Sequence, residues 1–127
     1  MCMREDFTFS FEMPTKGIAE YGTAEVKLPP LLDNSEIVVV RYSLPFGLDA
    51  APDTETGEVV VTKDGKGGEK VGDILRQTTY WRGPSSPAIL DVSKKMKTSG
   101  FDTVVQALVS NDLSVTDEIV LILERPL

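Results

Sequence analysis

Residues 36–50 read EIVVVRYSLPFGLDA, a run in which a strand, a loop and a second strand follow one another. The first part, Glu36 to Ser43, is dense in valine and isoleucine, which favour a buried strand. Leu44 to Leu48 combines a proline with a glycine, so we expect the strand to end there in an apolar loop. A second extended piece is expected from Leu48 to Ala51.

The rest of the chain predicts a mainly β (α+β) domain with one good helix. Further strands are expected at Glu58 to Thr62, Ile74 to Tyr80 and Glu118 to Leu123. Residues 64–68 read DGKGG and predict a loop. They do not predict a phosphate-binding loop, because the required glycine and lysine spacing is absent and no helix follows.

The helix is expected from Phe101 to Ser110, and its apolar residues lie on two faces. Phe101, Val105 and Leu108 follow one another at intervals of four and three residues, which places them in one stripe. The remaining apolar residues, Val104 and Ala107, point to an adjoining face. One face can therefore pack on the core while the other lines a groove, although the stripe can equally be wholly core.

Residues 1–35 predict an N-terminal extension that is separate from the domain at 36–127. Phe7 to Phe11 alternates aromatic with polar residues, which is the period of a half-buried strand. Ala24 to Leu28 predicts a short extended piece, and the two prolines that follow it restrict the backbone. The three phenylalanine rings need a surface to cover.

Composition excludes several classes of function. The net charge of −7 opposes contact with nucleic acid, and no apolar run approaches the roughly 20 residues that a membrane-spanning helix needs. The chain has no histidine, and its single cysteine, Cys2, cannot form an internal disulfide. We therefore expect no enzymatic activity, no catalytic residue, no metal site and no cofactor.

Three motifs occur in the order found in a known family of binding modules. They are Leu-Pro-Phe-Gly-Leu at 44–48, Val-Gly-Asp-Ile-Leu at 71–75, and the helical run that begins at Gly100 and Phe101. With a valine-rich strand before them and a closing strand after them, residues 36–127 resemble a PDZ domain. The resemblance implies a small strand sandwich or partly open barrel with one groove helix. The motifs look most like those of the PDZ-like proteins of plant and algal plastids.

The resemblance also implies a peptide-binding site. In the family, a partner chain adds as an extra strand beside the strand at 48–51, so main-chain hydrogen bonds give affinity and pockets give specificity. The partner's terminal carboxylate accepts hydrogen bonds from amides of the loop, and a cation upstream helps directly or through water. The residues expected to bind the peptide are Arg41, Phe46, Gly47, Leu48, Asp49, Ala50, Phe101, Val105 and Leu108.

The chain departs from the family pattern between Asp73 and Phe101, where it is longer than usual. We expect an insertion at about 81–99 that lies near the groove and either extends or blocks it. Within it, Trp81 to Pro87 predicts a connection, and residues 85–87 can cap a short turn over Ala88 to Val92. Trp81 is either an exposed contact residue or a loop anchor, and Lys94 to Lys97 is either a solvated face or a patch for an acidic partner.

Two functions remain open from the sequence. The first is a recognition module whose partner is a protein with a hydrophobic C-terminus or an extended strand. The second is an accessory subunit, peripheral to a membrane-protein complex such as a photosynthetic one, whose groove is filled by its own chain. Gly47 as a simple turn glycine and Arg41 as a solvated strand residue are the plainer interpretations of those positions. A plastid location is implied only by the resemblance.

Overall fold

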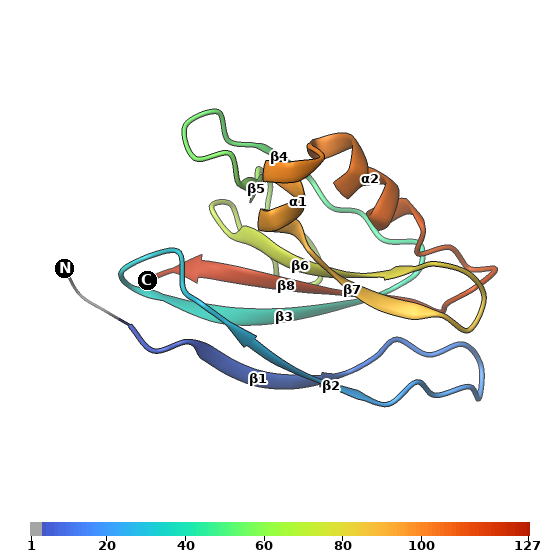
Figure 1. Cartoon of the computed structure of the whole chain (residues 1–127). Coiled ribbons are helices and arrows are strands. Elements are labelled where there is room, and N and C mark those ends of the chain that lie inside the picture. Colours follow the sequence, from blue (N-terminus) through green and yellow to red (C-terminus); the bar gives the residue numbers. More distant parts are fainter. Residues whose placement is uncertain (1–3) are drawn as a thin grey trace.

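The computed structural model describes residues 4–127, and it is mainly β, as the sequence predicts. Two antiparallel sheets lie in separate layers, and two helices cover the outer face of the larger sheet (Figure 1). The sheets are not closed into a barrel. Cys2 lies outside the described residues. Among residues 4–127, no helix is long and apolar enough to cross a membrane.

The larger sheet has six strands, and the predicted strands within it are confirmed to within a few residues. Its order is β3-β8-β6-β5-β4. Strand β7 lies off this path and pairs with the part of β6 from Gln77 to Trp81. Every pairing in it is antiparallel. The strands are β3 (Ser35–Ser43), β4 (Ala50–Pro52), β5 (Val59–Val61), β6 (Ile74–Trp81), β7 (Pro87–Asp91) and β8 (Glu118–Pro126).

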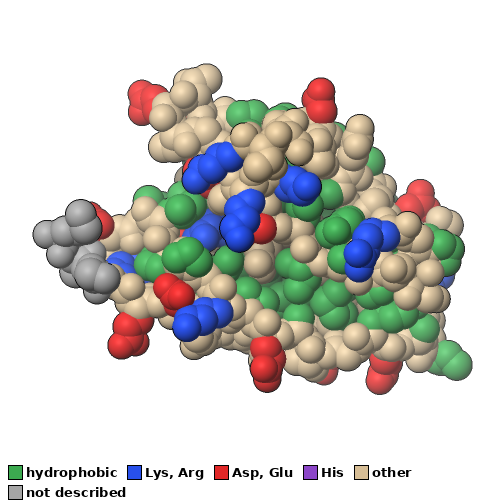
Figure 2. All heavy atoms as spheres, in the orientation of Figure 1, with side chains coloured by type: hydrophobic (Ala, Val, Ile, Leu, Met, Phe, Trp, Pro, Cys, Tyr) green, Lys and Arg blue, Asp and Glu red, His purple; other side chains and the backbone are tan. Residues whose placement is uncertain are grey.

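The N-terminal residues form a second sheet of two strands, β1 (Phe7–Glu12) and β2 (Thr23–Leu28), which pair antiparallel. The alternation predicted from Phe7 to Phe11 is confirmed, because the phenylalanines turn to one face and the polar residues to the other. Phe11 and Leu28 pack against Val120 and Ile122 of β8. Figure 2 shows apolar side chains along the seam between this layer and the larger sheet.

Two consecutive helices, α1 (Val92–Thr98) and α2 (Phe101–Val109), cover the opposite face of the larger sheet (Figure 1). The sequence predicts α2 but not α1. Helix α1 is short, and its charged run carries no clear apolar stripe, so the pattern alone does not reveal it. It begins at Asp91, whose carboxylate accepts a hydrogen bond from the Lys94 amide, 3.1 Å away. Met96 packs on the core, while Lys94 and Lys97 are exposed.

The alternative of a short turn over Ala88 to Val92 is wrong, because most of this segment belongs to strand β7. Ile89 packs towards the β1–β2 layer and Leu90 towards the helices, so both faces of the strand are used. Trp81 is only 7% exposed, and its ring lies edge-on to Tyr21 with centroids 5.3 Å apart. It therefore anchors the chain internally and is not an exposed contact residue.

A buried ion pair between β8 and β6 also holds the end of the extension by hydrogen bonds. The carboxylate of Glu124 in β8 is fully buried and contacts the guanidinium of Arg76. It also accepts hydrogen bonds from the Ser35 hydroxyl at 2.6 Å and from the amides of Leu31 and Leu32 at 3.0–3.1 Å. Burial by itself would raise the pKa of Glu124, but these hydrogen bonds together outweigh burial and lower the pKa.

Replacing Glu124 by glutamine removes the charge that compensates Arg76 while keeping the size of the side chain. We expect the free energy of unfolding at pH 7 to fall by about 3 kcal/mol, the scale for breaking a buried pair from one side. Since the folded pKa lies below the ordinary value of 4.5, this stabilisation is present above pH 4.5 and is lost as the pH falls through the folded pKa.

Denaturant unfolding at a series of pH values measures this difference, and the curves of wild type and Glu124→Gln should approach each other in acid. Glu25→Gln, on the exposed outer face of β2, is the control and should follow the wild type. A constant gap between wild type and Glu124→Gln at every pH would contradict the role assigned to the ion pair.

Candidate functional site

A groove of about 490 Å³ lies between the outer edge of β4 and helix α2. The structure brings together there all the predicted peptide-binding residues except Arg41. Val59 and Val109 also line the groove, and the sequence analysis missed them. Val109 lies one helical turn after Val105. Extending the apolar stripe by one more turn would therefore have predicted it. The lining residues are Phe46, Gly47, Leu48, Asp49, Ala50, Val59, Phe101, Val105, Leu108 and Val109.

Helix α2 uses its two apolar faces differently. Val104 is fully buried and Ala107 nearly so, and both belong to the core between the helices and the sheet. Val105 is 37% exposed, and Phe101 and Leu108 are half-buried. The stripe is therefore not wholly core. Phe101 and Leu108 pack against the core and also line the groove, and Val105 lines the groove.

The edge of β4 that faces the groove has free main-chain groups. The Asp49 carbonyl accepts from the Thr62 amide at 2.8 Å, and the Asp53 amide donates to the Glu58 carbonyl at 2.7 Å. Because hydrogen-bonding direction alternates along an antiparallel strand, Leu48 and Ala50 point their main-chain groups away from β5. Pro52 faces the same way but has no N–H. The free edge therefore offers amide donors at two positions before proline ends the series.

The loop before β4 carries two more unused donors. Within residues 4–127, the amides of Phe46 and Gly47, like that of Leu48, have no hydrogen-bond acceptor. The backbone of Gly47 is not in the left-handed region, and a Cβ built there would meet no atom within 4 Å. Local backbone conformation therefore does not require glycine at this position, which weakens the interpretation of Gly47 as a simple turn residue.

Arg41 does not line the groove. Its guanidinium donates to the Glu12 carbonyl at 2.6 Å and pairs with the Glu118 carboxylate. The reason is the alternation of β3, which turns Arg41 to the same face as Ile37, on the side of the β1–β2 layer. The structure thus places Arg41 outside the lining of the groove, and a contribution of its charge to ligand binding stays a prediction.

A neighbouring cleft of about 780 Å³ meets the groove at Gly47 and Asp49 and includes Arg41, Lys63 and Lys66 in its wall. The glycine-rich loop at residues 64–68 lies beside this cleft and is held by hydrogen bonds with Tyr42. The Tyr42 hydroxyl donates to the buried Glu69 carboxylate and accepts from the Gly67 amide at 2.8 Å. Burial, and then the hydrogen bond to Glu69, raise the pKa of Tyr42.

The loop is glycine-rich because its backbone runs against these side chains. A Cβ at Gly67 would lie 2.7 Å from the Tyr42 ring, which no relaxed structure allows. Close packing thus explains the glycine at position 67 of the DGKGG sequence.

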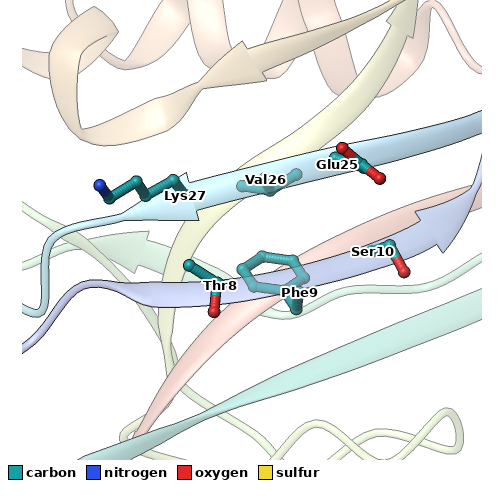
Figure 3. A pocket seen from close by; sticks show the side chains of 6 residues that line it. All are labelled: Thr8, Phe9, Ser10, Glu25, Val26 and Lys27. Atoms are coloured by element: carbon teal, nitrogen blue, oxygen red, sulfur yellow. The ribbon is translucent and has the colours of Figure 1, made fainter.

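A further hollow of about 470 Å³ lies on the β1–β2 sheet (Figure 3). The cross-strand neighbours Thr8 and Lys27, and Ser10 and Glu25, stand on its rim. All four side chains are exposed and belong to the polar outer face of the sheet. They offer one carboxylate and one ammonium group to solvent, whereas the two apolar residues of the lining, Phe9 and Val26, already pack towards β8, so this hollow is a weaker binding candidate than the groove.

The groove is not filled by other parts of the described chain. The β1–β2 layer packs on the opposite face of β8, and the segment at 81–99 forms the end of β6, strand β7 and helix α1. None of these residues is among those that line the groove.

No protein-family model matches the chain, and comparisons with curated proteins and with solved structures find no significant match.

Two neighbouring valines of α2 allow the roles of its faces to be separated. Val104→Ala should lower the free energy of unfolding by about 2 kcal/mol, because it leaves a cavity in the core. Val105→Ala should change it by no more than about 0.5 kcal/mol, since that side chain is partly exposed and its truncation leaves no enclosed cavity in the core. Equilibrium unfolding in denaturant measures both, and equal losses would mean that Val105 belongs to the core.

Proposed function

We propose that this chain is a non-enzymatic protein-interaction module of the PDZ-like kind, which binds an extended apolar segment of another protein at the free edge of β4. The observation that carries the proposal is the groove itself, in which an unpaired strand edge faces the apolar stripe of α2. The order of strands in the larger sheet supports the same proposal, because β4 is an edge strand and its outer side has no partner in that sheet.

The main chain of the ligand supplies only part of the binding energy. The outward amides of Leu48 and Ala50 donate to the added strand, and each such bond contributes about 1 kcal/mol net. Micromolar affinity corresponds to about 8 kcal/mol, so side-chain burial must supply the larger share. Phe101, Val105 and Leu108 provide the apolar wall against which that burial takes place.

The character of the wall sets the preference of the site. Phe101 stands at the start of α2, where many members of the family that the chain resembles carry a histidine that selects a hydroxyl residue in the ligand. An aromatic ring offers no hydrogen bond and favours an apolar ligand residue instead. We therefore expect apolar residues at alternate positions of the ligand, on the side that faces α2.

The alternative function, an accessory subunit whose groove is filled from within, has less support. It requires a segment of the chain in the groove, and residues 4–43 and 81–99 contribute none of the lining. A plastid location, and attachment to the edge of a photosynthetic membrane complex, belong to the proposal only through the resemblance of the sequence motifs.

The outward amide of Ala50 gives a direct test of strand addition. Ala50→Pro removes this donor without removing a hydrogen bond to β5, whereas Ala50→Ser keeps the donor and the small size. We expect Ala50→Pro to weaken binding of the best ligands from an array of valine- and leucine-rich peptides by about tenfold, and Ala50→Ser to have little effect. Fluorescence titration gives the affinities.

In the wild type, peptide binding should also slow hydrogen exchange at the Leu48 and Ala50 amides. Equal affinity of the proline and serine variants would mean that the ligand does not pair with β4. Absence of binding by any peptide of the array would argue against the recognition function as a whole.

The preference for apolar ligand residues can be tested at Phe101. Phe101→His places a hydrogen-bonding ring at the start of α2, and we expect the peptides preferred on the array to gain serine or threonine opposite it. Phe101→Leu, which keeps the wall apolar, is the control and should keep the original preference. If the histidine variant selects the same peptides as the wild type, Phe101 does not contact the ligand.

A further inference from the structure

The apolar surface of the groove does not end at the Gly47 loop. A second cleft of about 360 Å³ shares Phe46 and Val109 with the groove and continues past them towards Leu113. The segment that follows β3 passes beside the C-terminal end of α2 there (Figure 1). Val109 is 66% exposed and Leu113 is 53% exposed, so the continuation carries large apolar side chains that no described part of the chain covers.

The charged residues that line the two connected clefts are aspartates, and the Lys16 ammonium, which donates to the Leu113 carbonyl at 2.5 Å, lies beside the far end. The charged side chains that line them are Asp49 in the groove and Asp112 in its continuation, and neither cleft has a lysine or arginine in its lining. The guanidinium of Arg41 is held by Glu12 and Glu118. The cleft on the other side of the loop has Lys63 and Lys66, but it also has Asp49 and Asp64. A free carboxylate at the loop would therefore find amides but no dedicated cation.

The short free edge of β4 also favours a ligand that continues beyond the loop. Pro52 limits the main-chain ladder to the region of Leu48 and Ala50, so a ligand that stopped at the loop would depend on the apolar wall of α2 alone. A ligand that continues over Phe46 adds contacts with Val109 and Leu113. Positive charges on such a ligand would also be attracted to the two aspartates and to the chain's net charge of −7.

We infer that the groove takes an internal segment of a partner protein, one that runs through the groove, crosses the Gly47 loop and continues into the cleft at Leu113, with basic residues beside Asp49 and Asp112. This inference rests on the proposed function and specifies its ligand. Apolar residues of the segment face α2 and Phe46, and lysine or arginine residues flank them.

The test uses the full chain and two random-peptide libraries, one displayed with free C-termini and one with linkers on both sides of each peptide. The tightest-binding peptide is then synthesised in three forms: with linkers on both sides, with an amidated end, and with a free carboxylate directly after its last apolar residue. We expect the form with linkers to bind at least as tightly as the others and the selected peptides to be rich in lysine or arginine.

Matched variants locate the contact. Leu113→Ser, at a position that lines the continuation and not the groove, should weaken binding of the form with linkers by about tenfold, while Val71→Ser should leave it unchanged. Val71 is the matched control because it is 62% exposed and lies outside both clefts. Asp112→Asn should weaken binding at low salt and have little effect at high salt, because salt screens exposed charges. Glu25→Gln, on the opposite layer, should have no effect at either salt concentration.

Each result decides between the alternatives. Binding that requires a free carboxylate overturns the inference but leaves the proposed function standing. Equal binding by the Leu113 and Val71 variants also overturns it, because the ligand then ends at the loop. Selection of no peptide from either library contradicts the proposed function and the inference together. Concentration-dependent dimerisation that is lost in Leu113→Ser would assign the cleft to a second copy of this chain instead.

Discussion

Strand β8 is the constraint on which the other elements depend, because none of its side chains from Ile119 to Glu124 is exposed. Ile119, Leu121 and Leu123 face the helices, while Val120 and Ile122 face the β1–β2 layer. A strand that is apolar on both faces needs a cover on each side. The two-stranded N-terminal sheet provides one cover, and the two helices provide the other. Glu124, the one charged residue in this run, is compensated by Arg76 and by the residues that lead into β3.

This division of the core leaves α2 free to serve two purposes. Since Val104 and Ala107 already complete the core, the stripe that begins at Phe101 can remain partly exposed beside β4 without a large loss of stability. The edge strand is correspondingly short, and Pro52 prevents a long ladder with a second sheet. The groove thus combines a rigid helix wall with a strand edge that accepts a short partner and resists indiscriminate pairing.

Much of the fold was predictable, since the alternation from Phe7 to Phe11 and the two faces of α2 are local patterns. The groove residues from Phe46 to Ala50 were predicted as a set because a motif in the sequence carries them. Strand β7 and helix α1 were not predicted, because their short segments acquire their structure from pairing with β6 and from Asp91 at the helix start. The position of Arg41 was also missed, since it depends on which face of β3 meets the β1–β2 layer.

The amino-acid sequence by itself determined the mainly β class, the helix at Phe101 and the apolar loop at Gly47, because periodicity and turn residues act over a few neighbouring positions. Tertiary structure alone decided that the loop and the helix enclose one groove, that Arg41 lies outside it, and that Val109 and Leu113 extend it past the loop. The physical reason is that these relations depend on strand pairing and layer packing between residues far apart in the chain, which no local pattern encodes.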